Sequence, residues 1–145
     1  MGKSLIHIII ALCAGALCSL SPALAQDVRT FVPSGAEVYA PLLVEKQRAI
    51  WPAAPEPWTL AGLVEQESCI SPTHSRCWNP RAELRTSREY GFGFGQITVA
   101  YTSSGAVRFN KFEELRAAHE SLRAWTWADR YDPGYQLTAV VEMNL

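Results

Sequence analysis

The sequence lacks a surplus of charge of either sign. Its 13 lysines and arginines nearly balance its 14 aspartates and glutamates, which gives a formal net charge of −1. No run of basic residues stands out, so we expect no nucleic-acid partner. Internal repeats and low-complexity tracts are also absent from the sequence. A balanced chain of this length is typical of one globular domain.

Cysteine is scarce. Of the four cysteines, two lie in an apolar N-terminal stretch, and the other two are Cys69 and Cys77. In an oxidising compartment, an isolated pair that closes a short loop is typical of a disulfide, which would stabilise the fold by roughly 2–3 kcal/mol. A zinc site would need His74, which lies between them, and a fourth ligand that is not apparent. We therefore predict a Cys69–Cys77 disulfide and expect no metal and no organic cofactor.

Long apolar runs are also rare, and the one at the N-terminus has the pattern of a signal peptide. Lys3 precedes the apolar stretch 6–20, and the small-residue site 23–25 follows it. The apolar stretch is short for a membrane span. We predict that residues 1–25 are a cleaved signal peptide and that residues 26–145 are periplasmic or secreted, without stable membrane insertion. An uncleaved anchor is the alternative.

Hydrophobic periodicity and capping residues predict a mostly helical domain. The expected helices cover about residues 36–50, 57–68, 110–119 and 133–145. Asn110 followed by Glu113, and Asp132 followed by Pro133, are typical of helix starts. A long loop after the second helix leads to residues 91–98, where alternating Phe and Gly predict a small strand or irregular element. The expected class is therefore α+β with mostly α structure.

The second of these helices places an acid where a core residue is expected. Leu60, Leu63 and Val64 lie on one face at helical spacing, and the next position of that face is Glu67. A carboxylate that loses hydration has a raised pKa, which a general acid needs near neutral pH. The alternative is a buried glutamate that forms an ion pair with an arginine. If Glu67 is a general acid rather than part of such an ion pair, it is the candidate catalytic residue.

Three segments on and after this helix resemble motifs of one enzyme family. They are Glu67-Ser68, Trp78-Asn79-Pro80-Arg81-Ala82 and Gly93-Phe94-Gly95-Gln96-Ile97. In this order they resemble the lytic transglycosylases of the soluble-lysozyme (SLT) type, which carry an E-S pair at a helix end, an aromatic-N-P-x-A stretch and a G-L-M-Q-I/V segment. Asp132-Pro133 and Gln136-Leu137 are similar to the D-P-x-x-N-L start of a later helix in that family. The resemblance implies a lysozyme-like domain over residues 26–145.

The resemblance implies cleavage of peptidoglycan between N-acetylmuramic acid and N-acetylglucosamine by one glutamate, here Glu67. It would first protonate the glycosidic oxygen and then, as a carboxylate, take the proton from the sugar's C6 hydroxyl, which closes a 1,6-anhydro ring. A hydrolytic muramidase, one alternative, would usually need a second carboxylate. The candidates Glu83, Glu89 and Asp129 have no obvious apolar setting, and we interpret them as solvated loop charges. An inactive exported glycan-binding protein is the other alternative.

The motif positions also imply substrate-binding residues. Ser68 would hydrogen-bond the sugar or the catalytic acid, and Gln96 would bind sugar amides or hydroxyls; a helix C-cap and a buried amide are the structural alternatives. Gly93 would let the backbone approach the sugar, and Phe94 takes the place of the family's leucine. Tyr101 offers a flat face for a sugar ring. Peptidoglycan glycan strands are the implied partner, and an envelope-spanning assembly is a further candidate.

The sequence departs from the family pattern in two places. The insert between the first two motifs is longer than usual, and the predicted disulfide would close it. The family's later A-Y-N-x-G motif, whose tyrosine contacts the catalytic glutamate, has no match before the sequence ends at Leu145. We therefore expect a domain truncated at its C-terminus. In such a domain, the apolar face of Leu137, Val140 and Val141 would lack part of its cover.

Overall fold

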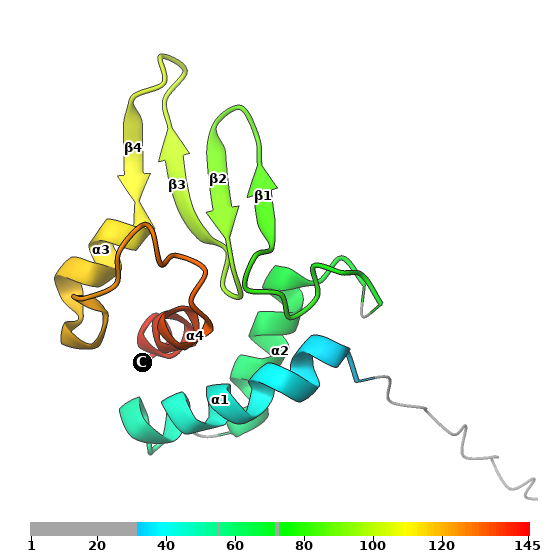
Figure 1. Cartoon of the computed structure of the whole chain (residues 1–145). Helices are drawn as coiled ribbons and strands as arrows, with labels where there is room; N and C mark the ends of the chain where they lie inside the picture. The colour runs from blue at the N-terminus through cyan, green and yellow to red at the C-terminus, as the bar shows by residue number, and fades with distance from the viewer. Residues whose placement is uncertain (1–31, 55, 72) are drawn as a thin grey trace, which may run out of the picture.

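The computed structural model describes residues 32–54, 56–71 and 73–145 (Figure 1), and the predicted signal peptide lies outside them. The helices in this part are α1 (Ser34–Ile50), α2 (Pro57–Ser68), α3 (Lys111–Ala118) and α4 (Pro133–Glu142), with a short 3-10 turn η1 (Glu120–Leu122). The strands are β1 (Glu83–Arg85), β2 (Glu89–Phe92), β3 (Ile97–Tyr101) and β4 (Val107–Asn110). The predicted α+β class is confirmed. In these residues, no helix has the length and apolar character that crossing a bilayer requires.

The strands form one antiparallel sheet in the order β1-β2-β3-β4. β2 and β3 pair up to Phe92 opposite Ile97, so the turn of residues 93–96 lies at the end of the sheet nearest the helices (Figure 1). The β element predicted at 91–98 is confirmed in place, but the sheet extends over residues 83–110. Strands β1 and β4 are short and largely exposed. They therefore lack the apolar alternation by which a strand is recognised in a sequence.

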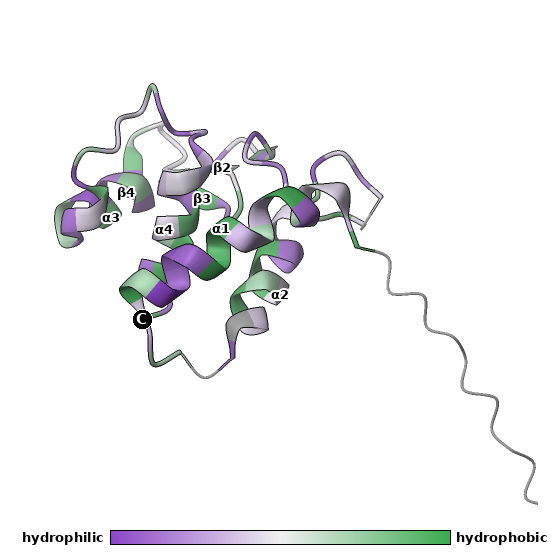
Figure 2. Ribbon diagram, turned by 60° about the horizontal axis from the view of Figure 1, so that its bottom comes forward, coloured by the Kyte–Doolittle hydropathy of each residue, from purple (hydrophilic) through white to green (hydrophobic). Residues whose placement is uncertain are grey.

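The first hydrophobic core lies between α1, α2 and α4. Its buried residues also come from the loop after α2 and from the β2–β3 turn; they are Leu43, Leu60, Val64, Cys77, Trp78, Phe94, Leu137, Val140 and Val141. Helix α1 lies against α4 in both views of the fold (Figures 1 and 2). The expectation that Leu137, Val140 and Val141 lack cover is wrong, because each is 0% exposed. Residues of α1, α2 and the turn fill the space around α4.

The second hydrophobic core joins the sheet to α3 and to the segment that leads to α4. Its buried residues are Tyr90, Phe92, Ile97, Phe112, Leu115, Leu122, Trp125 and Ala139. Several rings meet edge to face: the Trp125 ring lies 4.7 Å from that of Phe112 and 6.1 Å from that of Phe92, between centroids. Such pairs stabilise a core beyond the area that they bury. This core therefore fixes the sheet relative to α4.

Capping side chains set the starts of α3 and α4. Asn110 Oδ1 accepts a hydrogen bond from the Glu113 N–H at 3.2 Å, and Asp132 Oδ1 accepts one from the Tyr135 N–H at 2.9 Å. Each bond satisfies one of the backbone donors that a helix leaves unpaired at its N-terminus. Pro133, the first residue of α4, has no N–H that needs a partner. Both predicted helix starts are confirmed.

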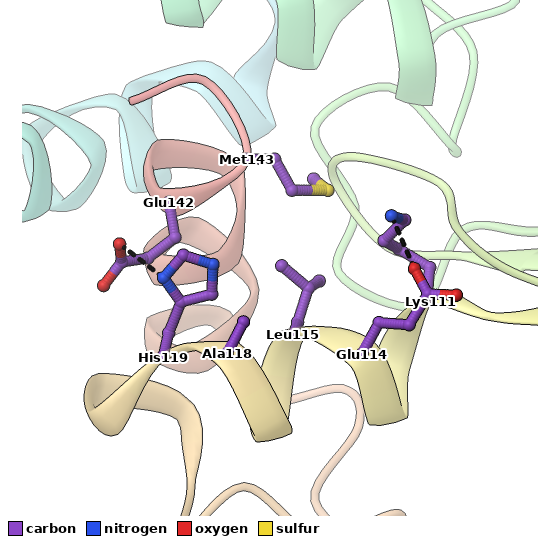
Figure 3. Close-up of a pocket in the computed structure, with 7 residues that line it drawn as sticks. All are labelled: Lys111, Glu114, Leu115, Ala118, His119, Glu142 and Met143. Carbon is purple, nitrogen blue, oxygen red and sulfur yellow. Dashed lines mark ion pairs between the residues drawn. The ribbon is translucent and has the colours of Figure 1, made fainter.

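The end of α4 is held by the Glu142 carboxylate. Its Oε1 accepts a hydrogen bond from Ser121 Oγ at 2.5 Å, and its Oε2 lies 2.9 Å from His119 Nδ1. His119 and Glu142 line a cavity of about 550 Å³, whose apolar side includes Leu115 and Met143 (Figure 3). The two contacts therefore join the end of α4 to the end of α3.

Replacing Glu142 by alanine is expected to lower the free energy of unfolding by about 1–2 kcal/mol, measured by urea denaturation. His119 and Ser121 would each lose a partner, and the Glu142 side chain is only 11% exposed. Glu120→Ala is the matched control, because Glu120 pairs with Arg123 while 77% exposed and should contribute under about 0.5 kcal/mol. A loss for Glu142→Ala as small as the one expected for the control would show that the Glu142 contacts do not stabilise the fold.

Candidate active site

The buried face of α2 differs from the predicted one by one position. Leu60, Val64 and Ser68 are 3%, 0% and 1% exposed, whereas Leu63 and Glu67 are half-buried beside them. The prediction that Glu67 continues the buried face is therefore wrong in detail: the carboxylate lies at its edge. The reason is that α2 buries residues four positions apart, so that Ser68 takes the core position. At the edge, the acid keeps access to solvent or to a ligand.

The Glu67 carboxylate has no partner in the part of the chain that the structure describes. Among residues 32–54, 56–71 and 73–145, it takes part in no hydrogen bond and no ion pair. The alternative in which an arginine neutralises it therefore has no support in the described part of the chain. A half-buried acid that no described side chain neutralises can contact a ligand at this edge of α2.

Ser68 connects α2 to the loop that follows it. Its Oγ donates a hydrogen bond to the Val64 carbonyl at 2.6 Å and accepts one from the Trp78 N–H at 3.0 Å. The hydroxyl is buried and holds both partners, which favours the structural alternative over contact with a sugar. A role of Ser68 in substrate binding stays a prediction. What the bonds establish is that the first two motifs lie side by side.

The predicted disulfide between Cys69 and Cys77 is confirmed. It closes the insert immediately after α2 and returns the chain to Trp78, which has a positive φ of 51° and is 2% exposed. The left-handed backbone is unfavourable for a tryptophan, and the bond from its N–H to Ser68 together with the buried ring holds it there. The longer insert thus leaves the two motifs adjacent, as predicted.

The third motif forms the β2–β3 turn. Phe94 is 0% exposed, and its ring centroid lies 5.1 Å from that of Tyr39 and 6.2 Å from that of Trp78. The Phe94 side chain is therefore a core residue, and its predicted contact with substrate would have to come from the backbone. Gln96 has a positive φ of 43°, and its Nε2 donates to the Gly93 carbonyl at 3.0 Å. Its buried Oε1 has no hydrogen-bond partner among the described residues.

A buried amide, Gln136 of α4, holds the turn in place. Its Oε1 accepts a hydrogen bond from the Phe94 N–H at 3.1 Å, and its Nε2 donates to the carbonyls of Pro80 and Arg130, each at 2.8 Å. Gly93 lies so close that a Cβ there would overlap this amide, and its φ of +76° also favours glycine. In the sequence, Gln136 was notable only as part of a motif at a helix start. The structure shows that it bonds the second and third motifs.

The three motif segments therefore converge at the C-terminal end of α2. Ser68 bonds Trp78, Trp78 packs against Phe94, and Gln136 bonds both Pro80 and Phe94. Figure 1 shows this end of α2 beside the β2–β3 turn. Tyr101 lies apart from these motifs, because it is the last residue of β3, at the end of the strand opposite the β2–β3 turn.

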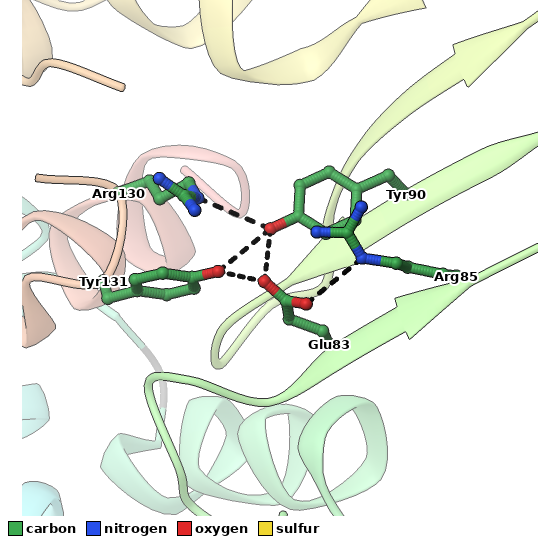
Figure 4. Close-up of polar contacts among 5 residues, drawn as sticks. All are labelled: Glu83, Arg85, Tyr90, Arg130 and Tyr131. Atoms are coloured by element: carbon green, nitrogen blue, oxygen red, sulfur yellow. Dashed lines mark hydrogen bonds and ion pairs between the residues drawn. The ribbon is translucent and has the colours of Figure 1, made fainter. Parts of the chain in front are cut away.

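A second polar cluster lies between the β1–β2 hairpin and the segment before α4 (Figure 4). The Glu83 Oε1 accepts hydrogen bonds from the hydroxyls of Tyr90, at 2.6 Å, and Tyr131, while its Oε2 accepts one from Arg85 Nε at 3.2 Å. Arg130 Nε donates to the Tyr90 hydroxyl at 3.4 Å. The interpretation of Glu83 as a solvated loop charge is therefore wrong. Strand pairing brings Tyr90 to Glu83, and only the tertiary fold brings Tyr131, so no local sequence signal marks the cluster.

This network fixes the charge of Glu83. Hydrogen bonds from Tyr131 and Tyr90, with a smaller contribution from Arg85, lower the pKa of Glu83 to about 2. Burial, together with the bond to Glu83, raises the pKa of Tyr90. Glu83 therefore stays ionised at neutral pH and is unsuited to act as a general acid. Of the other two candidate carboxylates, Asp129 accepts a hydrogen bond from Thr126 Oγ1, and Glu89 is exposed on β2.

The depressed pKa of Glu83 predicts a stability that depends on pH. The folded-state pKa lies below the usual 4.5, so the contribution is complete above about pH 4.5 and is lost as the pH falls toward 2. Glu83→Gln should lower the free energy of unfolding by about 1–2 kcal/mol at pH 7, a range that allows for solvent screening of the partly exposed group. The difference between variant and wild type should shrink in urea titrations at pH 4 and 3. Glu89→Gln, at an exposed position, is the control, and a difference independent of pH would contradict the prediction.

Comparisons with protein-family models, curated proteins and solved structures found no match to this chain. The resemblance to the lytic transglycosylases therefore rests on its motif residues. In the described residues, no group of three or more His, Cys, Asp or Glu side chains is placed to hold a metal ion.

Proposed function

We propose that this protein cleaves peptidoglycan glycan strands between N-acetylmuramic acid and N-acetylglucosamine and leaves 1,6-anhydromuramoyl ends. One observation carries the proposal: the three segments that resemble transglycosylase motifs, separate in sequence, converge at the end of α2, where Glu67 lies half-buried and unpaired among the described residues. Glu67 directly precedes Ser68, whose hydroxyl bonds the backbone of the second motif. The predicted signal peptide and the disulfide agree with a site of action in the periplasm or outside the cell.

In this proposal Glu67 acts twice. Protonated Glu67 donates its proton to the glycosidic oxygen as the bond from that oxygen to C1 of the muramic acid breaks, and N-acetylglucosamine leaves with a free hydroxyl. The resulting carboxylate takes the proton of the C6 hydroxyl of the same muramic acid while its O6 bonds to its C1. The proton returns to Glu67, no water is consumed, and the enzyme needs no second acid.

The other carboxylates support this mechanism over hydrolysis. A muramidase usually needs a second carboxylate to stabilise the intermediate or to activate water. Glu83 has both oxygens occupied by Tyr90, Tyr131 and Arg85, and Asp129 is bonded to Thr126. These two candidates are therefore engaged with other side chains, and Glu89, the third, is exposed on β2 rather than at the end of α2.

The products of digestion test the proposal directly. Purified peptidoglycan is treated with the exported protein, and the released muropeptides are analysed by mass spectrometry before and after borohydride reduction. Anhydro ends, one water lighter and inert to borohydride, are the expected result. Reducing ends alone would identify a muramidase, and binding without cleavage would identify a glycan-binding protein; either outcome would overturn the proposal.

A further inference from the structure

We propose that a cavity beside the β1–β2 hairpin is a subsite for a carboxylate of the substrate, which on peptidoglycan is carried by the stem peptide. The inference rests on the proposed function for the identity of the substrate. The cavity has a volume of about 340 Å³, and its lining includes Arg85, Tyr101, Trp127 and Arg130. It lies on the sheet, away from the end of α2, so that a bound strand would contact the protein at two places.

Of the two arginines that line this cavity, Arg130 is the one that no described carboxylate neutralises. Its Nε donates to the Tyr90 hydroxyl at 3.4 Å, and one terminal nitrogen donates to the Trp127 carbonyl at 3.0 Å. Its guanidinium lies 4.3 Å from the centroid of the Tyr131 ring and 5.1 Å from that of Trp127. Within the residues that the structure describes, no carboxylate lies within ion-pair distance of Arg130. A half-buried guanidinium without a counter-ion keeps donors free for an anion.

The neighbours of Arg130 hold it in position. Glu83 accepts the hydroxyl protons of Tyr90 and Tyr131, which leaves the Tyr90 oxygen to accept a bond from Arg130 (Figure 4). Arg85, which stacks on Tyr90 at 4.1 Å, is already paired with Glu83. Two arginines thus share the cavity: Arg85 has a counter-ion, whereas Arg130 has none among the described residues.

The aromatic side chains of the lining favour a ligand that carries apolar atoms next to its carboxylate. Trp127 is 42% exposed, although its ring lies 5.5 Å from that of Phe92 and 5.2 Å from that of Phe112, both in the second core. One part of the indole is therefore anchored in the core while another part faces solvent. Its exposed part and the half-buried Tyr101 offer flat surfaces to apolar atoms. Glu89, which is exposed and also lines the cavity, repels a polyanion more strongly than a single carboxylate.

The test uses the Glu67→Gln variant, because it would leave the ligand uncleaved, and titrates its tryptophan fluorescence with three ligands. The first is the muramic acid disaccharide with its stem peptide; the second is the same disaccharide without the peptide, which frees the lactyl carboxylate; the third is chitobiose, which has no carboxylate. A further Arg130→Gln change should weaken binding of the peptide-bearing ligand about tenfold and of chitobiose less than twofold. Arg130→Lys, which keeps the charge without the planar fork, should give an intermediate loss. Arg108→Gln, at an exposed arginine of β4, is the matched control.

The outcomes separate this inference from the proposed function. A tenfold loss shared by the peptide-free disaccharide, whose only carboxylate is the lactyl group, would support a subsite that accepts a carboxylate from either the stem peptide or the lactyl group. An unchanged affinity of the Arg130→Gln variant for the peptide-bearing ligand, or an equal loss for all three ligands, would overturn the subsite. If the wild-type chain cleaves no peptidoglycan while Arg130 still governs carboxylate binding, the proposed function fails and the subsite stands.

Discussion

Replacing Glu67 by glutamine is expected to lower the rate of glycan-strand cleavage by roughly 10²–10⁴-fold, the usual contribution of a general acid and base. Glutamine keeps the shape of the side chain but cannot transfer the proton in either step. Among the described residues, Glu67 bonds to no other group, so the variant should fold as the wild type does. The release of soluble muropeptides from purified peptidoglycan measures the rate, and a thermal melt checks the fold.

The matched control is Glu65→Gln, on the same helix and also half-buried. It should cleave at a rate within a factor of two of wild type, because position 65 is not part of the converging motifs. A Glu67→Gln variant that melts normally and still releases muropeptides at the wild-type rate would remove Glu67 from the mechanism. Equal losses in the two variants would point to damage of α2 as the cause.

Replacing Gln136 by leucine is expected to lower the free energy of unfolding by about 3–5 kcal/mol. The change preserves most of the side-chain volume but leaves the Phe94 N–H and the carbonyls of Pro80 and Arg130 without partners in a buried site. An unpaired buried donor or acceptor costs about 1–3 kcal/mol, and partial rearrangement of the turn should keep the total below the sum. Urea denaturation at pH 7 measures the loss.

Gln66→Leu provides the comparison for this substitution. Gln66 is exposed on α2, so the same chemical change there should alter the free energy of unfolding by less than about 0.5 kcal/mol. A loss below about 1 kcal/mol for Gln136→Leu would show that the turn does not depend on the amide. The structural basis for the convergence of the motifs would then be in doubt.

Local signals allowed much of the fold to be predicted. The side chains of Asn110 and Asp132 bond backbone groups three residues away, so the sequence around them contains the whole helix start. The Cys69–Cys77 pair is likewise a local feature. Strand β1 has no such signal, because its three residues take their conformation from pairing with β2.

Of the candidate site, the sequence could predict only those features that do not depend on contacts between distant residues. A helical pattern could not decide whether position 67 or 68 enters the core, because both follow the apolar positions 63 and 64 at helical spacing; the packing of Ser68 against the Trp78 backbone decides it. Tyr131 and Glu83 are distant in sequence, and so are Gln136 and Pro80. Contacts of this kind depend on the tertiary fold, and no pattern in a single sequence reveals them.

The close approach of Gly93 to the Gln136 amide has an evolutionary consequence. Any side chain at position 93 would occupy the space of the amide, and any shorter residue at position 136 would open that space while leaving the turn unbonded. Substitution at either position should therefore be selected against, and a shorter residue at position 136 would not relieve the strain that the positive φ imposes on a side chain at position 93. Relatives of this chain should therefore keep glycine at position 93 and a side-chain amide at position 136, despite the separation of the two positions in sequence.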